Sequence, residues 1–383
     1  MTPSRHIMII AGELSGDIHG ADLVRELRYR DPNLAFSGLG GPNMAAQGVS
    51  LYEDMTQLAV IGFVEIFRHF FQIKKLFNLV LTQCHKQRPD AVILIDYPGF
   101  NLRLAKALRR RGIKVLYYIA PKAWAWKERR VEMIKKYVDR LLIIFAFEKS
   151  FYAKHGYAAD FVGNPLLDHI RVTSSRHDFL LANGLNPNAP TIGLIPGSRK
   201  NEIRTLLPIM LAAAKIIRNR IPRAQFLISQ APHLNESLLA QFRQDPSIPS
   251  AVIKDDFHNC IHACDICLTT SGTATLETAI LKKPMVIIYK TAWLTALLAR
   301  LLLKIRWVGL PNIIAGKTIV PECIQNDATP EKITRTLLAV YSDPFKMETT
   351  INALNDVTSA LGEPGAAGRA ADIILTDIRK NNR

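Results

Sequence analysis

Short runs of apolar residues alternate with segments of helical spacing along most of the chain. The runs at residues 6–11, 90–96, 114–120 and 140–145 are each followed by such a segment. Because these runs are apolar at nearly every position, they are typical of parallel strands covered on both faces, and not of strands that face water on one side. The repeated order of strand and helix predicts an α/β fold.

A second series of the same kind follows a polar segment. Residues 172–189 are rich in Asn, Pro and Ser and interrupt the pattern, which is typical of a connection between domains. Further strands are predicted at 191–196, 224–230, 251–254, 265–270 and 284–289. We therefore predict two doubly wound Rossmann-like domains that face a cleft, over 1–171 and 172–345. The C-terminal helices, 346–383, are expected to pack back on the N-terminal domain.

Composition limits the classes of protein that remain. The chain has 383 residues and is 48% hydrophobic, so it can form two cores and is not disordered. Lys and Arg total 49 against 33 acidic residues, and the net charge of +16 indicates an anionic partner such as nucleic acid, an acidic membrane or a phosphorylated substrate. The five cysteines and the absence of a long apolar run predict a cytoplasmic chain without a transmembrane helix.

The loop after the first predicted strand reads GELSGD at residues 12–17. Its glycines permit a tight turn before a helix, but the spacing matches neither a dinucleotide-binding motif nor a Walker motif. Two acids would repel a phosphate, so Glu13 and Asp17 fit contacts to sugar hydroxyls or proton transfer better. The alternative is a turn whose polar residues only cap the helix.

Asp96 ends the apolar run at 90–96 and is expected at the carboxyl end of a buried strand. A carboxylate there can accept a proton from an attacking hydroxyl group. The alternative is that Asp96 caps the following helix, but Asn101 is better placed for capping, which favours Asp96 as a general base. All charged residues between Asp96 and Glu128, Lys122 among them, are basic, and they form a solvated face or meet phosphate.

The second domain offers residues suited to a nucleotide diphosphate. Arg199 follows a predicted strand, and a planar guanidinium suits a diphosphate. Ser271, Gly272 and Thr273 lie where a strand turns into a helix, and backbone N–H groups at a helix N-terminus bind anions. Glu277, further along that helix, could hold a ribose diol. Each element alone is also explained by capping and turn formation.

Two segments have the composition of membrane-facing surfaces. Residues 62–83 place several phenylalanines on one helical face, and both an interfacial helix and ordinary core packing explain this pattern. Residues 290–307 combine tryptophans with basic residues and are too interrupted to span a bilayer. The residues predicted to face a membrane are Phe63, Phe67, Phe70, Phe77, Trp293 and Trp307.

A group of cysteines and histidines at residues 258–267 fits no standard zinc spacing, since it contains one CxxC and no second pair. Cys264 and Cys267 flank an apolar strand, where small buried residues are expected. We therefore predict no metal site.

Eight short motifs, in this order, resemble the lipid-A-disaccharide synthase family of inverting glycosyltransferases with the GT-B architecture. They are AGELSGD at 11–17, GPNM at 41–44, IDYPGFN at 95–101, APKAWAW at 120–126, GNP at 163–165, PGSR at 196–199, TSGTATLE at 270–277, and LPNIIAG with the following PE at 310–322. The resemblance covers nearly the whole chain.

The resemblance implies a reaction in which UDP-2,3-diacylglucosamine and 2,3-diacylglucosamine 1-phosphate give the β(1′→6) disaccharide and UDP. It implies that Asp96 is the base and that Glu13 and Ser15 belong to a catalytic N-terminal loop. No cofactor or metal is expected if Arg199 and a helix N-terminus neutralise the diphosphate. The residues implied to bind UDP are Arg199, Ser271, Gly272, Thr273, Glu277 and Asn312.

Acylated substrates imply a peripheral location on the cytoplasmic face of the inner membrane, and the basic charge agrees with anionic lipid. A homodimer is one expected assembly. Another GT-B UDP-GlcNAc transferase or a UDP-sugar 2-epimerase is the nearer alternative. A basic nucleic-acid-binding protein is a remote one, because the sequence contains no recognisable binding module.

Overall fold

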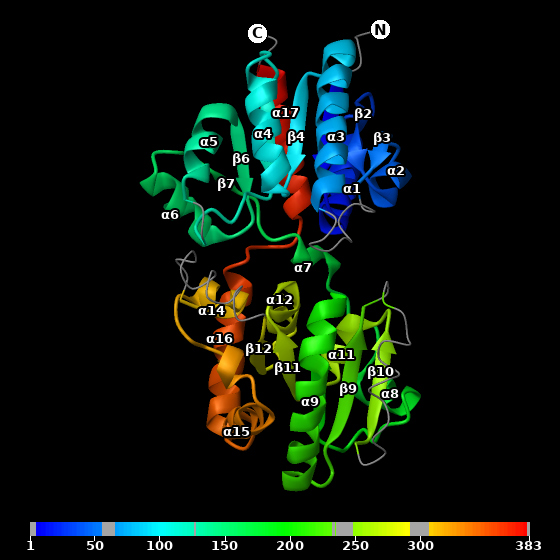
Figure 1. Ribbon diagram of the computed structural model, residues 1–383, viewed down its shortest axis with the longest axis vertical. Coiled ribbons are helices and arrows are strands. Elements are labelled where there is room, and N and C mark those ends of the chain that lie inside the picture. Colours follow the sequence, from blue (N-terminus) through cyan, green and yellow to red (C-terminus); the bar gives the residue numbers. More distant parts are fainter. Residues whose placement is uncertain are drawn as a thin grey trace. The chain divides into compact units, whose positions relative to one another are not determined.

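The computed structural model describes residues 5–55, 66–125, 128–231, 234, 248–291 and 306–380, with the side chains of 66–70 left out. The chain forms two compact units, which are described separately. Unit 1 comprises residues 1–168 and 361–383, and unit 2 comprises residues 169–360 (Figure 1).

Unit 1 contains a seven-stranded sheet in which every strand pair is parallel. The strands run in the order β3-β2-β1-β4-β5-β6-β7, so the direction of winding reverses between β1 and β4. Such a reversal is the topological switch point of a doubly wound sheet. The strands are β1 (His6–Ala11), β2 (Ala35–Gly40), β3 (Ser50–Asp54), β4 (Ala91–Ile95), β5 (Val115–Tyr118), β6 (Arg140–Ile143) and β7 (Asp160–Phe161).

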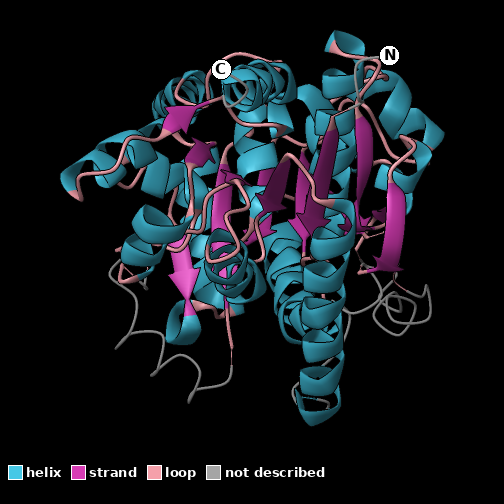
Figure 2. Cartoon of the chain, turned by 90° about the horizontal axis from the view of Figure 1, so that it is seen from above, coloured by secondary structure: helices cyan, strands magenta, loops and turns pink. Residues whose placement is uncertain are grey.

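Helices cover both faces of this sheet, which is why its central strands β1 and β4 are almost entirely apolar. In β1, Met8 and Ile10 pack into the core beneath α3 to α6, whereas Ile7 and Ile9 pack against α1 and α17. Figure 2 shows strands with helices on either side. The helices are α1 (Leu14–Arg30), α2 (Pro42–Ala46), α3 (Ile66–Gln87), α4 (Pro98–Arg109), α5 (Arg130–Tyr137), α6 (Ala146–Lys154), α7 (Leu166–His169) and α17 (Ala366–Lys380).

Unit 2 repeats this plan with a six-stranded parallel sheet in the order β10-β9-β8-β11-β12-β13. Its switch point lies between β8 and β11. The strands are β8 (Thr191–Ile195), β9 (Gln225–Gln230), β10 (Ser250–Lys254), β11 (Ile266–Thr270), β12 (Met285–Tyr289) and β13 (Glu322–Ile324). The predicted α/β fold with two doubly wound sheets is confirmed.

The helices of unit 2 also cover both faces of the sheet, with α9 and α15 on one face and α8, α11, α12 and α16 on the other. Cys264 and Cys267 lie in the second core and are buried as expected. The elements are α8 (Arg176–Ala182), α9 (Lys200–Arg220), α11 (Phe257–His262), α12 (Thr273–Ile280), α14 (Leu310–Ala315), η3 (Gln325–Asp327), α15 (Pro330–Tyr341) and α16 (Pro344–Ser359).

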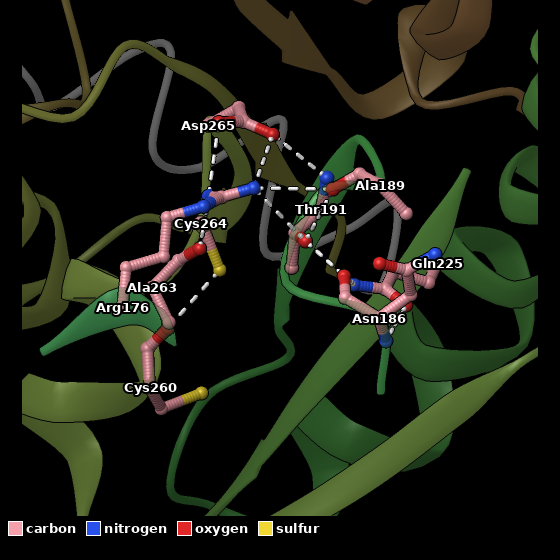
Figure 3. Close-up of polar contacts among 9 residues, drawn as sticks. All are labelled: Arg176, Asn186, Ala189, Thr191, Gln225, Cys260, Ala263, Cys264 and Asp265. Carbon is pink, nitrogen blue, oxygen red and sulfur yellow. Dashed lines mark hydrogen bonds and ion pairs between the residues drawn. The ribbon is translucent and has the colours of Figure 1, made fainter. Parts of the chain in front are cut away.

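The polar segment 172–189 was expected to be a connection between domains, and this prediction is wrong for most of it. It contains α8, which is a packed part of unit 2. Figure 3 shows the guanidinium of Arg176 directed at Asp265, with 2.9 Å between Nη1 and Oδ1. Gln225 exchanges hydrogen bonds with the backbone of Asn186 at 2.9 and 2.7 Å. These contacts tie the segment to the sheet.

The C-terminal tail is divided between the units, which corrects the predicted boundaries of 172–345 and 346–383. Helix α16 stays in unit 2, where Leu354 is fully buried. Only α17, red in Figure 1, returns to unit 1 and packs against α1. Asp372 pairs with Arg30 at 2.5 Å and Asp377 pairs with Lys114 at 2.7 Å.

Candidate functional site

The loops that follow the two central strands of each sheet are the natural positions for a site, because ligands of open α/β sheets bind at the carboxyl ends of strands near the switch point. In unit 1 these loops follow β1 and β4, and in unit 2 they follow β8 and β11. The residues predicted from the sequence to be catalytic lie on the first pair of loops. The residues predicted to bind UDP, apart from Asn312, lie on or just beyond the second pair.

Asp96 directly follows β4 in an unusual backbone conformation. Asp96 and Tyr97 both have φ of 44°, in the left-handed region that non-glycine residues rarely adopt. The buried side chain of Asn101 donates through Nδ2 to the carbonyls of Ile95 at 3.1 Å and Asp96 at 2.8 Å. The hydroxyl of Tyr117 also donates to the Asp96 carbonyl. Two buried side chains therefore hold the turn that aims Asp96.

Asn101 was predicted to be the N-cap of the following helix, and this is wrong. Helix α4 begins earlier, with Tyr97 as its N-cap and Pro98 as its first residue. Proline suits the first position of a helix because its missing N–H would have no partner there. Asn101 lies inside the helix and supports the Asp96 turn instead.

The carboxyl group of Asp96 lies among charges of both signs. Partial burial raises its pKa from the ordinary value, Lys122 and Arg130 lower it, and Glu13 raises it. A buried carboxyl binds its proton more tightly, whereas a nearby cation favours the ionised form. The net raised pKa suits a group that must accept a proton near neutral pH.

The loop after β1 contains one structural acid and two exposed polar residues. Glu13 is the N-cap residue of α1 and is exposed, as is Ser15 in the first turn. Asp17 is completely buried and accepts backbone hydrogen bonds from Gly41 at 2.7 Å and Met44 at 3.0 Å. It thereby caps the short helix α2. The prediction that Asp17 contacts a sugar or transfers a proton is wrong.

Gly12 allows the two loops of unit 1 to come together. A Cβ atom at Gly12 would lie 2.4 Å from Cδ1 of Tyr97, so the tyrosine ring needs the space that glycine leaves. This close packing brings Glu13 near enough to Asp96 to raise the pKa of the carboxyl. Glu13 and Asp96 therefore lie near each other at the carboxyl end of the unit 1 sheet.

Arg199 is the N-cap residue of α9, just beyond β8, and its side chain is 82% exposed. Its Nη1 atom lies 3.0 Å from Oε1 of Glu202. An exposed ion pair contributes little to stability, so an anionic ligand can compete for the guanidinium. Gly197, with φ of 104°, makes the turn, and a Cβ there would lie 3.0 Å from Cγ2 of Thr270.

The loop after β11 leaves open space at the start of α12. Gly272 has φ of 147° and is the N-cap residue, and a Cβ placed on it would meet nothing within 4 Å. Gly272 and Thr273 are exposed, and the hydroxyl of Ser271 donates to the carbonyl of Val308 at 2.8 Å. Backbone N–H groups at a helix N-terminus can bind an anion, and the open space at Gly272 leaves room for one.

Glu277 lies on α12 beyond that loop, and its side chain is 18% exposed. Its Oε1 atom is 3.3 Å from Nε2 of His258, and the other ring nitrogen of His258 accepts from the backbone N–H of Arg171 at 3.4 Å. The histidine therefore donates to Glu277. A carboxylate with one such partner can still accept hydrogen bonds from a diol.

Asn312 was predicted to lie in the nucleotide wall, but its side chain is fully buried. Nδ2 donates to the carbonyl of Val320 at 2.8 Å and to Glu322 at 2.9 Å. Oδ1 accepts from the backbone N–H groups of Ile319 and Val320 at 2.8 and 3.0 Å. All of these hydrogen bonds are made to the segment 319–322, so Asn312 stabilises the connection between α14 and β13.

The predicted membrane-facing residues have different outcomes. Phe77 packs against the first core, 5.8 Å from the ring of Phe100, so for this residue the core alternative holds and the membrane prediction is wrong. Trp307 is partly buried and donates to Thr318 at 2.8 Å. The side chains of Phe63, Phe67, Phe70 and Trp293 lie outside the described residues. None of the described helices is long and apolar enough to cross a membrane.

One buried acid escaped the sequence analysis. Glu148 is only 1% exposed and lies near the start of α6, where it accepts from Nε1 of Trp124 at 3.0 Å. Burial raises its pKa to about 7. Its other oxygen, Oε2, accepts from the backbone N–H of Phe145, the N-cap residue of α6, at 3.2 Å. Because Phe145 is not a Ser or Thr, the sequence does not show the usual capping-box signal at this position.

Solved structures with the same arrangement place the chain in a class. UDP-GlcNAc 2-epimerase from Neisseria meningitidis bound to UDP-GlcNAc matches with a TM-score of 0.62 and 14% identity, covering 98% of this chain and all of that one. MurG from Acinetobacter baumannii matches with a TM-score of 0.59 and 16% identity, covering 97% and 99%. The fold is that of the GT-B glycosyltransferases and the related epimerases.

Sequence comparison then gives the family. The family model for lipid-A-disaccharide synthetase matches residues 7–370. Lipid-A-disaccharide synthase of Geobacter metallireducens is 41% identical over 378 residues, covering 99% of this chain and 98% of that protein. The protein of the same name from Syntrophus aciditrophicus is 41% identical over 380 residues, with 99% of both covered. The chain belongs to the lipid-A-disaccharide synthetase family and is a glycosyltransferase of lipid A biosynthesis.

Proposed function

We propose that the chain transfers the glucosamine unit of UDP-2,3-diacylglucosamine to the 6-hydroxyl of 2,3-diacylglucosamine 1-phosphate. The products are the β(1′→6)-linked lipid A disaccharide 1-phosphate and UDP. The observation that carries this assignment is the division of chemistry between two switch points. The loops of unit 1 present Asp96 and Glu13, and the loops of unit 2 present Arg199 and the open N-terminus of α12.

In this mechanism Asp96 is the general base. Its carboxylate takes the proton from the acceptor hydroxyl while that oxygen forms a bond to the anomeric carbon of the donor. The bond from the anomeric carbon to the diphosphate oxygen breaks, and UDP leaves with the electron pair. A single displacement of this kind inverts the anomeric centre. Burial is the main cause of the raised pKa of Asp96, and the negative charge of Glu13 adds to it.

The departing diphosphate needs positive charge, and unit 2 supplies it from the protein itself. The exposed guanidinium of Arg199 can bind phosphate oxygens in a bidentate manner. The N–H groups at Gly272 and Thr273 add the positive end of the α12 dipole. We therefore propose that no metal ion is required. Glu277 would hold the ribose, and Ser271 would keep the loop in place through Val308.

The substrates carry acyl chains, so we propose a peripheral position on the cytoplasmic face of the inner membrane. The net charge of +16 suits an anionic lipid surface. In the described part of α3, Phe71 is 72% exposed and lies near the exposed Lys74 and Lys75. An exposed aromatic ring beside lysines is typical of interfacial helices.

The direct experiment mixes purified protein with both proposed substrates in detergent, with EDTA and no added metal. We expect the disaccharide 1-phosphate by mass spectrometry together with an equal amount of UDP. Release of UDP without disaccharide would contradict the proposed acceptor. A reaction that starts only after a divalent metal is restored would contradict the metal-free mechanism.

A further inference from the structure

The loop between β5 and α5 exposes a single side chain over residues 119–125. Ala120, Pro121, Ala123 and Ala125 are buried, and Trp124 is partly buried, whereas Lys122 is exposed. The backbone turns on itself, since the N–H of Ala123 donates to Pro121 at 2.6 Å and that of Ala125 donates to Lys122 at 3.1 Å. The loop is therefore buried on either side of Lys122, and the Lys122 side chain extends from it to the surface.

Helix α6 holds this loop on both sides of Lys122. On one side, the hydroxyl of the buried Tyr152 donates to the carbonyl of Pro121 at 3.2 Å. On the other side, Nε1 of Trp124 donates to Oε1 of Glu148 at 3.0 Å. The ring of Trp124 also packs edge-on against Phe147, with 5.1 Å between the ring centroids.

Capping alone does not explain why Glu148 is buried. Its second oxygen accepts from the backbone N–H of Phe145 at 3.2 Å, as an N3 residue of a capping box does. Glu202 performs the same capping in α9 while remaining 19% exposed. Burying a carboxyl group is costly, and the side-chain contact that Glu148 makes beyond capping is the one to Trp124.

The charge of Lys122 acts on the carboxyl group of Asp96. Strands β4 and β5 are neighbours, with Ile95 opposite Tyr118, so their following loops emerge side by side. Among the charges that act on Asp96, Lys122 lowers its pKa most, Arg130 acts in the same direction and Glu13 in the opposite one. The same lysine lowers the pKa of Glu148.

We propose that Glu148 is a positioning residue of the active site, which fixes the 119–125 loop through Trp124 so that Lys122 stands beside Asp96. This inference rests on the proposed role of Asp96 as the base. A loose loop would weaken the influence of Lys122, and Asp96 would then hold its proton to higher pH. The fraction of enzyme with an ionised base at neutral pH would fall.

The test is the pH dependence of kcat/KM, whose acid limb reports the base of the free enzyme. Removing the cation in Lys122→Met should move the acid limb up by about 0.5 pH unit or more. Trp124→Phe keeps an aromatic ring but loses the N–H donor, and we expect a shift in the same direction. Glu148→Leu should behave likewise, whereas Glu148→Gln, which can still accept from Trp124, should stay near the wild-type profile.

A double variant distinguishes loss of the Lys122 position from a general loss of structure. Lys122→Met combined with Trp124→Phe should shift the limb no further than Lys122→Met alone, because both changes act through one charge. The control is Asp139→Asn at the other end of β5, where the carboxylate accepts from the N–H of Val115 at 2.9 Å. This variant should lose stability without moving the limb.

The outcomes distinguish the inference from the function on which it rests. If Asp96→Asn retains activity, Asp96 is not the base and the proposed mechanism fails. If Asp96→Asn is inactive but the acid limb is unmoved in Trp124→Phe and in Glu148→Leu, the positioning role of Glu148 is overturned. Additive shifts in the double variant would also overturn it.

Discussion

The two switch points of this chain share one topology and differ in chemistry. In each unit, a loop after one central strand packs closely on the end of its neighbour or on the loop that follows it, with Gly12 against Tyr97 in unit 1 and Gly197 beside Thr270, the last residue of β11, in unit 2. The first pair presents carboxylates and the second presents a guanidinium and an open helix N-terminus. Topology therefore determines where a site lies, and the loop residues determine what it does.

The two sites also differ in how they make their turns. The loops after β8 and β11 of unit 2 use glycines, Gly197 and Gly272, for their positive φ angles, and at Gly272 this leaves open space close to the backbone. Unit 1 places Asp96 and Tyr97 in the left-handed region and holds them with buried side chains. The proposed base is thus held in a strained turn, whereas the proposed phosphate site is built on glycines that leave the backbone accessible.

The largest expected effect is on kcat, through Asp96 at the switch point of unit 1. Asp96→Asn removes the proton acceptor while keeping the size of the side chain, and we expect kcat to fall by about 10²–10⁴-fold. Steady-state disaccharide formation at saturating substrates measures this loss. A fall of less than about tenfold would remove Asp96 from the role of base.

The next largest effect is on kcat/KM for the UDP-sugar, through Arg199 at the switch point of unit 2. Arg199→Ala would remove the proposed charge-assisted contact to the diphosphate, and one such bond contributes about 1.5–3 kcal/mol, so kcat/KM for the UDP-sugar should fall by about 10–100-fold. Arg199→Lys keeps the charge without the planar fork and should recover only part of the loss. An unchanged kcat/KM in Arg199→Ala would contradict the diphosphate assignment.

A pair of glycine substitutions sharpens the comparison between the loops. Gly272→Ala places a Cβ in the space above the α12 N-terminus and strains a φ of 147°, so affinity for UDP should fall by about tenfold. Gly99→Ala is the matched control, because a Cβ there also meets nothing within 4 Å, but it lies within α4 of unit 1. Equal loss of UDP affinity in both variants would contradict the placement of UDP on unit 2.

The smallest effect on activity is expected for Glu148→Gln, so this variant is tested through its stability. Burial raises the pKa of Glu148 from 4.5 to about 7, so the folded state binds this proton more tightly than the unfolded state. The resulting stabilisation is complete below about pH 4.5 and is lost as the pH rises through about 7.

Because Gln does not titrate, the free energy of unfolding of Glu148→Gln should improve relative to the wild type between pH 5 and pH 8. We expect a relative change of about 2 kcal/mol in urea unfolding, since the raised pKa spans most of this pH range and one pKa unit is worth about 1.4 kcal/mol. A difference that stays constant with pH would contradict the raised pKa.

The central strands of both sheets were predictable because burial on both faces leaves a continuous apolar run. Strand β1 (His6–Ala11) matches the predicted range, and β4, β8 and β11 agree within a residue or two. Strands β2, β3, β7 and β13 were missed. They are edge strands, very short, or rich in glycine and serine as β2 is, and periodicity does not distinguish such strands from loops.

The positions of two candidate residues relative to the sheets were predictable: Asp96 directly follows β4, and Arg199 lies in the turn between β8 and α9. Roles that depend on what a side chain meets in three dimensions were not. Asp17 and Asn312 resemble ligand-binding residues in sequence, but both are buried and their polar atoms are used within the fold. Glu148 was missed because its partner, Trp124, lies on another element.

Calorimetric titration of UDP into Asp96→Asn and Arg199→Ala, in parallel with the wild type, tests the division of labour most directly. We predict that Asp96→Asn binds UDP as the wild type does, because its change lies on unit 1. Arg199→Ala should bind UDP at least tenfold more weakly. Comparable weakening in both variants, or unchanged binding in Arg199→Ala, would contradict the assignment of proton transfer to one switch point and of nucleotide binding to the other.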